Sequence, residues 1–156
     1  LVETLPHIFD GTAVYEKQPE ESPTPYAGMI TKQMGLINFG KSAAELERLV
    51  RGLNPWPSAF TFWNGKTLKV WESFVVKSEE AGTEKPEPGT VVKTDKKGIY
   101  VACGEDVLVL SQVQLEGKKR MDADAFLRGC HIETGSRFTD KMDILMDFML
   151  ILLMYC

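Results

Sequence analysis

The sequence predicts a mostly β domain with short helices, built on five antiparallel strands that form a small barrel. Three observations support this fold class. Five short segments rich in β-branched and aromatic residues follow one another between residues 59 and 115, and turn signals separate them. An amphipathic segment precedes them at 42–52. The 156 residues, 44% hydrophobic and 26% charged, suit one folded domain with appendages.

The first 41 residues carry only weak signals of regular structure. Apolar residues recur near helical spacing over 1–10, and Gly11 follows as a stop signal. Residues 16–25 contain three Pro and three Glu, a composition that cannot bury itself and predicts an extended linker. Three Gly break the short apolar pairs of 26–40. We therefore expect a linker over 16–41.

The segment 42–52 is predicted to be an amphipathic helix. Ser42 and Glu45 have the spacing of a capping box, and Gly52 provides a stop. One face is apolar and is formed by Leu46, Leu49, Val50 and Leu53. Trp56 follows between two Pro residues that stiffen the chain, and we expect its side chain to anchor this helix against the barrel.

Five strands are predicted after this helix, with a second short helix behind them. The strands are expected at 59–63, 67–76, 90–94, 99–103 and 106–115. Asn64-Gly65 predicts a tight hairpin between the first two. In the second strand, Leu68, Val70 and Phe74 are expected on one side, with Trp71 out of phase. Asp122 is a candidate cap for the short helix.

The charge distribution excludes one class of protein and leaves another open. The net charge of −4 excludes a strongly basic nucleic-acid binder. Residues 31–78 nevertheless carry seven basic and three acidic side chains, so a local basic face is compatible with the total. Three Cys without metal-ligand spacing favour reduced thiols in a cytoplasmic protein.

The search for catalytic chemistry finds no candidate. His7 and His131 lie in different segments, and neither has a Cys, Asp or Glu at ligand spacing. The known nucleophile, metal-site and phosphate-loop motifs are missing from the sequence. Cys103 ends an apolar strand and is expected to be a small buried hydrophobe. We therefore predict no catalytic residue and no metal site in this chain.

The strongest candidate for a function is a run of three basic residues. Lys118, Lys119 and Arg120 follow Gly117 at a junction between strand and helix, where they could meet phosphate groups. A solvated basic loop is the alternative interpretation. Other basic side chains could widen the patch, and these are Lys32, Arg51, Lys66, Lys69, Lys93, Lys96 and Lys97. Three aromatic residues could stack nucleobases or belong to the core, and these are Trp63, Trp71 and Tyr100.

Several short segments, in order and spacing, resemble the carboxy-terminal part of methionyl-tRNA formyltransferase. The segments are PYA (25–27), GLINF (35–39), NPWPSA (54–59), LKVW (68–71), PGTV (88–91), VACG (101–104) and QLEGKKRM (114–121). The resemblance covers about residues 1–138. In the family's IDW segment, Asn38 replaces the aspartate and Phe39 replaces the tryptophan.

The resemblance implies an OB-like barrel that binds initiator tRNA, preceded by a Rossmann-like catalytic domain. On this reading, residues 1–15 are the remnant of the last helix of the catalytic domain, 16–41 the linker and 42–138 the OB-like domain. Lys118, Lys119 and Arg120 would contact tRNA, with Lys32 and Arg51 as weaker candidates. The family's co-substrate is 10-formyltetrahydrofolate, which belongs to the missing domain. We expect this chain to be an inactive, cytoplasmic monomer that does not bind membranes.

Two points stay open at this stage. Similar barrels also follow the catalytic domains of other 10-formyltetrahydrofolate-dependent enzymes, so an interaction barrel that does not bind tRNA is the alternative function. Residues 139–156 form an atypical apolar tail that ends in nine uninterrupted apolar residues. This tail could be a frame-shifted or read-through end, or a docking helix. The nine-residue run, 148–156, is well short of the roughly 20 apolar residues of a membrane-spanning helix.

Overall fold

The computed structural model describes residues 2–21, 24, 27–81 and 86–139. The predicted apolar tail of residues 139–156 lies, except for Thr139, outside the described residues. The elements follow in the order α1 (Thr4–Phe9), η1 (Lys32–Gly35), α2 (Ala43–Gly52), β1 (Ala59–Trp63), β2 (Lys66–Val76), α3 (Ser78–Ala81), β3 (Val91–Asp95), β4 (Gly98–Ala102), β5 (Val107–Leu115), β6 (Met121–Asp122) and α4 (Ala123–Gly129). The predicted fold class, mostly β with short helices, is confirmed.

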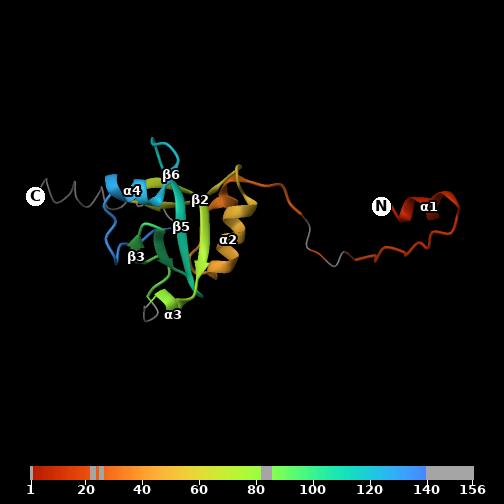
Figure 1. Ribbon diagram of the computed structural model, residues 1–156, viewed down its shortest axis with the longest axis horizontal. Coiled ribbons are helices and arrows are strands. Elements are labelled where there is room, and N and C mark those ends of the chain that lie inside the picture. Colours follow the sequence, from red (N-terminus) through yellow and green to blue (C-terminus); the bar gives the residue numbers. More distant parts are fainter. Residues whose placement is uncertain (1, 22–23, 25–26, 82–85, 140–156) are drawn as a thin grey trace, which may run out of the picture.

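The strands form one antiparallel sheet in the order β1-β2-β5-β4-β3, and β6 pairs with β5. The five predicted strands are present within one residue of their expected bounds, and β6 is a short addition. Asn64 and Gly65, with φ of 48° and 70°, form the predicted hairpin turn between β1 and β2. The sheet curls strongly (Figure 1) and is consistent with an OB-like fold.

A segment near the end of the described chain joins the two edges of the sheet. At the β1 edge, Phe62 and Thr139 exchange two backbone hydrogen bonds of 3.1 Å. At the β3 edge, the Val91 N–H donates to the Ser136 carbonyl and the Val91 carbonyl accepts from Gly135, both at 2.8 Å. The strands do not pair directly across this gap. The sheet itself is therefore not closed, and residues 135–139 bridge its two edges and satisfy edge groups that would otherwise be open to another chain.

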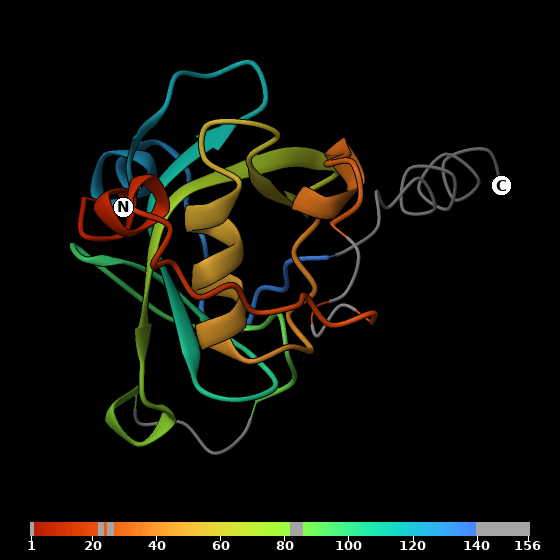
Figure 2. The same cartoon turned by 90° about the vertical axis from the view of Figure 1, so that its right-hand side faces the viewer.

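Helix α2 covers one side of the barrel as the sequence predicts. The Ser42 side chain accepts from the Glu45 N–H, and the Glu45 carboxylate accepts from the Ser42 N–H, which is the predicted capping box. Leu46 and Val50 are buried against β2 and β5. In Figure 2 this helix crosses the front of the sheet, and its C-terminal end lies at the same end of the molecule as the 116–120 loop.

Trp56 does not anchor α2, so that prediction is wrong. The Ser58 N–H donates to the Leu53 carbonyl at 2.9 Å. This hydrogen bond closes a tight loop of residues 54–57 that projects from the surface of the barrel. The Trp56 side chain is consequently 59% exposed. The end of α2 is fixed instead by the Asn54 side chain, whose Nδ2 donates to the Trp71 carbonyl at 3.3 Å.

Two compensating bulges divide the β2–β5 ladder. Val70 pairs with Val113 and Ser73 pairs with Leu110, while Trp71 on β2 and Ser111 on β5 have no direct partner. The inward face therefore changes phase along β2, from Leu68 and Val70 in its first half to Val75 in its second. Phe74 lies on the opposite face and is 37% exposed. The prediction that Phe74 shares a face with Leu68 and Val70 is wrong for this reason.

The core lies inside the barrel and beneath α2. Its fully buried members include Ile37, Leu46, Leu68, Ile99, Leu108 and Leu110. Ile37 and Phe39 come from the segment predicted to be linker. The Ile37 N–H donates to the Phe60 carbonyl at 2.8 Å, which draws residues 36–39 onto β1. Helix α1, by contrast, buries none of its residues and stands apart from the barrel (Figure 1).

Candidate nucleic-acid interface

The three predicted basic residues occupy an exposed loop between β5 and β6. Gly117, with φ of 74°, adopts the left-handed conformation that the turn requires. The Lys118 N–H donates to the Leu115 carbonyl at 2.9 Å, and the Lys118 carbonyl accepts from Gln114 Nε2 at 3.0 Å. The loop backbone is therefore fixed, while the side chains of Lys118 and Lys119 extend into solvent.

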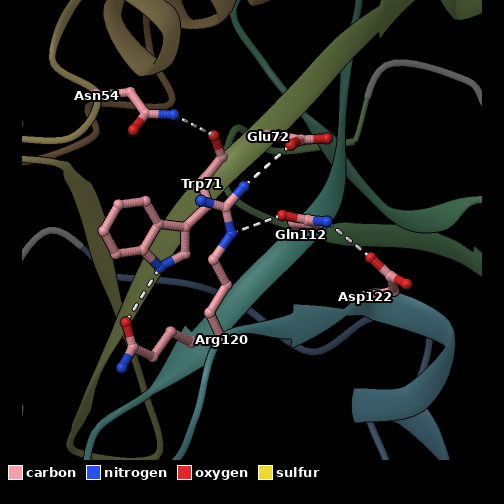
Figure 3. A network of polar contacts seen from close by, with 7 residues as sticks. Asn54, Trp71, Glu72, Gln112, Arg120 and Asp122 are labelled. Carbon is pink, nitrogen blue, oxygen red and sulfur yellow. Dashed lines mark hydrogen bonds and ion pairs between the residues drawn. The ribbon is translucent and has the colours of Figure 1, made fainter.

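Arg120 differs from the two lysines because its guanidinium is held by neighbours (Figure 3). Its Nε donates to Gln112 Oε1 at 2.6 Å, and its Nη2 donates to Glu72 Oε1 at 2.9 Å. The guanidinium carbon lies 5.0 Å from the centroid of the Trp71 ring, within the range of a cation–π interaction. The Arg120 side chain remains 41% exposed.

Trp71 lies at the centre of this cluster, on the outer face of β2 opposite the buried Leu68 and Val70. Its side chain is half-buried, and Lys69 Nζ lies 5.9 Å from its ring centroid. The indole Nε1 donates to Gln114 Oε1 at 3.1 Å. Trp71 is therefore tied to both β5 and the basic loop.

Asp122 takes the predicted N-cap position of α4, but its side chain does not cap the helix. The carboxylate instead accepts from Gln112 Nε2 at 2.8 Å. This leaves Gln112 Oε1 free to accept from Arg120, so one amide connects the start of α4 to the basic loop (Figure 3). The capping prediction is right for the position of Asp122 and wrong for its hydrogen bond.

The structure brings Arg51 close to the same cluster. Arg51 lies in the last turn of α2 and forms an ion pair with Glu47, with Nε 3.1 Å from Oε1. Arg51, Trp71 and Glu72 line one hollow of about 340 Å³. Lys32 lies on η1, which packs against β1, and among the described residues it takes part in none of these contacts.

Acidic side chains are interleaved with the basic ones, so the surface has mixed charge. The Thr67 N–H donates to the Glu116 carboxylate at 3.1 Å and lowers the pKa of Glu116, which keeps this group ionised beside Lys66. In the described part of the chain, four lysines near Trp71 and the loop have no ion-pair partner, and these are Lys66, Lys69, Lys118 and Lys119. They are the cations most available to a ligand.

The other two candidate aromatic residues belong to the packing of the barrel. Trp63 meets Phe126 edge to face, with ring centroids 6.0 Å apart, and packs against the core. Tyr100 is 6% exposed, and its hydroxyl donates to Asp95 Oδ2 at 3.1 Å. Neither ring is placed to stack a nucleobase, whereas Trp71 is at the surface.

The rest of the described chain offers little for catalysis. Within residues 2–21, 24, 27–81 and 86–139, no three His, Cys, Asp or Glu side chains gather in a way that could hold a metal ion. His7 pairs with the Thr12 hydroxyl at 2.9 Å, and His131 is exposed near Glu133. None of the described helices combines the length and apolar character needed to cross a membrane.

Comparison with known proteins places this barrel in a family. Residues 29–131 match the family described as formyl transferase, C-terminal domain. The chain belongs to the formyl transferase C-terminal domain family. It is 51% identical over 138 residues to the methionyl-tRNA formyltransferase of Agathobacter rectalis, and 44% identical over 136 residues to that of Bacillus subtilis.

These alignments confirm the resemblance to methionyl-tRNA formyltransferase. They cover 88% and 86% of this chain but 43% and 41% of the two relatives, so the chain spans less than half of their length. It corresponds to the C-terminal part of that family. HypX from Aquifex aeolicus, solved with tetrahydrofolic acid, shares the fold, with a TM-score of 0.52 over 81% of this chain and 12% identity.

The match to the formyl transferase C-terminal domain includes the whole basic loop and the Trp71 cluster. The sequence predicted the loop but not Glu72, Gln112 and Gln114, which hold it. A signal for two of them exists, because Gln112 and Gln114 are polar residues two apart at the end of a strand whose first four residues are apolar. Asn38, which replaces the family's aspartate, has a local role: its Oδ1 accepts from the Gly40 N–H at 2.9 Å.

Proposed function

We propose that this chain is the tRNA-binding part of a methionyl-tRNA formyltransferase, an enzyme that formylates methionyl initiator tRNA in translation initiation. The observation that carries the proposal is the basic loop, whose Lys118 and Lys119 are exposed and unpaired on a backbone fixed by hydrogen bonds. Lysine ammonium groups in this setting suit the phosphates of a nucleic-acid backbone.

The other predicted residues contribute less in this proposal. Arg51 lies beside the cluster but shares its charge with Glu47, and Arg120 shares its charge with Glu72. Lys32 adds a more separate positive charge on η1. Because contacts to phosphate carry little sequence information, the chain should bind initiator and elongator tRNAs with similar, modest affinity. The protein would act as a cytoplasmic monomer.

The proposal assigns the chemistry to a catalytic domain outside this sequence. That domain would hold 10-formyltetrahydrofolate and transfer the formyl group, while this barrel would hold the tRNA. The 156-residue chain should therefore bind tRNA without formylating it, which an assay with charged initiator tRNA and labelled co-substrate would measure. Formyl transfer by this chain would contradict the division of labour.

Two pairs of lysines provide a direct test of the binding surface. We expect K118A/K119A to weaken binding of initiator tRNA about tenfold at 50 mM salt. The variant neutralises fewer phosphates, so fewer counterions leave the RNA when it binds. The slope of log affinity against log salt should fall by about two, or about one for each phosphate contact. Fluorescence anisotropy with labelled tRNA over a salt series measures both quantities.

The matched control is K96A/K97A, which removes two exposed lysines from the β3–β4 turn. Both were candidates to widen the patch, but among the described residues neither side chain joins the contacts around Trp71 and the loop. This variant should bind as the unchanged chain does. Equal losses in both variants would indicate a general charge effect, and unchanged binding in K118A/K119A would remove the loop from the site. If the unchanged chain binds no tRNA at 50 mM salt, the alternative function, an interaction barrel of another folate-dependent enzyme, replaces this one.

A further inference from the structure

We propose that Trp71 is a positioning residue for the basic loop of residues 116–120, and that Arg120 supports the loop without contacting phosphate. The consequence for RNA binding rests on the function proposed above, whereas the effect on the order of the loop does not. The proposal divides the predicted basic trio into two contact residues, Lys118 and Lys119, and one supporting residue.

Two connections from Trp71 hold the loop, one at Lys118 and one at Arg120. The indole Nε1 donates to Gln114 Oε1, and Gln114 Nε2 donates to the Lys118 carbonyl, with distances of 3.1 and 3.0 Å. On the other side, the ring face carries the Arg120 guanidinium at 5.0 Å. One side chain therefore fixes the backbone before Lys119 and the side chain after it.

Trp71 is itself fixed from the opposite direction. It has no direct partner on β5, its ring lies on the outer face of β2, and the Asn54 side chain donates to its carbonyl oxygen at 3.3 Å. The loop is therefore supported by Trp71, a residue of β2 that is hydrogen-bonded both to β5 and to Asn54 just after α2. Lysine side chains lose conformational freedom when they bind, so a backbone that is already ordered lowers the total cost of binding.

The hydrogen bonds of Arg120 suit a role in supporting the loop better than a role in binding phosphate. Two of the five N–H donors of a guanidinium are used on Gln112 and Glu72. The Glu72 carboxylate also balances the charge, so a phosphate arriving at this point would meet a nearly neutral pair. A neutral pair releases few counterions. Removal of both charges in E72Q/R120A should therefore scarcely change the salt dependence of RNA binding, whereas R120A alone would leave the Glu72 carboxylate unbalanced.

Limited trypsin digestion of the full chain tests the order of the loop without RNA. We expect W71A to raise the rate of cleavage after Lys118 and Lys119 about tenfold, because the loop would no longer be held. Cleavage after Lys96 and Lys97, in the β3–β4 turn, should keep its rate and serves as the internal control. W71F keeps a ring beneath Arg120 but loses the Nε1 donor. Its rate of cleavage in the loop should therefore lie between the rates of the unchanged chain and of W71A.

The RNA arm compares the salt slopes of W71A and E72Q/R120A with that of K118A/K119A, using initiator tRNA as the probe. W71A and E72Q/R120A should each weaken binding about three- to tenfold while the slope changes by less than about 0.5. K118A/K119A should lower the slope by about two. Circular dichroism melting of every variant verifies that the barrel is folded, and W71F replaces W71A should the latter unfold.

Each result has a defined meaning. Loop cleavage that does not change in W71A or W71F overturns the positioning role, and an equal rise at the β3–β4 turn shows general destabilisation instead. A slope lowered by about one in E72Q/R120A overturns the supporting role and makes Arg120 a phosphate ligand. If the unchanged chain binds no tRNA, the proposed function fails, while the proteolysis still decides the role of Trp71.

Discussion

Cys103 shows how strongly the barrel changes the chemistry of one side chain. Burial at the end of β4 raises the pKa of its thiol to about 12, since a thiolate would be poorly solvated there. The side chain is 8% exposed, and Sγ contacts the Val101 carbonyl at 3.6 Å. The sequence-based interpretation of Cys103 as a buried hydrophobe is confirmed.

At the residue scale, this burial predicts that Cys103 is chemically inert in the folded protein. With iodoacetamide at pH 8, Cys103 should react at least about 100 times more slowly than the half-buried Cys130, because alkylation requires an accessible thiolate. Peptide mass spectrometry of timed samples measures both rates. In guanidinium chloride the two rates should converge, and similar rates in the native protein would contradict the buried placement.

Gly104 shows how a single small residue lets two elements approach. Its N–H donates to the carbonyls of both Phe39 and Lys41 at 2.9 Å, which binds the segment before α2 to the β4–β5 turn. A Cβ atom here would collide with the Gly40 carbonyl oxygen. The glycine is therefore required by the close contact between two backbones.

At the element scale, Gly104→Ala should lower the free energy of unfolding by about 2 kcal/mol, because the backbone of residues 39–41 would have to move. Urea denaturation followed by tryptophan fluorescence measures this change. Gly52→Ala is the matched control, since a Cβ at this end of α2 meets no atom within 4 Å. Loss of stability in both variants, or in neither, would contradict the close contact described here.

Local signals predicted the elements well, and long-range pairing explains what they missed. The capping box of Ser42 and the turn at Asn64-Gly65 are encoded within a few residues, so α2 and the β1–β2 hairpin could be read directly. The displaced Phe74 could not, because a bulge is defined by the partner strand. The supports of Arg120 were missed for the same reason, since Glu72 lies 48 residues away in the chain.

On the scale of the whole molecule, the barrel draws its stability from residue 35 onward. Ile37 and Phe39 are buried in the core, whereas α1 buries no residue. The domain boundaries predicted from the sequence therefore make a testable pair. Deletion of residues 1–15 should leave the melting temperature within about 1 °C of the full chain, since it removes no buried contact.

Deletion of residues 1–41, the remnant and the whole predicted linker, should instead destabilise the barrel by at least about 3 kcal/mol, because it empties the positions of two large core side chains. Differential scanning calorimetry of the two truncated chains measures both effects. A barrel that keeps its melting temperature without residues 1–41 would place the boundary where the sequence analysis put it, and a loss after removing 1–15 would reveal contacts of α1.

The paired irregularities at Trp71 and Ser111 also limit how this protein can change its length. Each adds one residue to its own strand, and the two additions cancel, so Leu68 opposite Leu115 and Phe74 opposite Val109 keep a common register. Losing either residue by itself would offset half of the ladder by one position and, on β2, turn Val75 away from the core. Losing both residues would restore the register of the two strands but would remove the Trp71 ring beside the basic loop. A tolerated deletion here therefore needs two simultaneous events 40 positions apart.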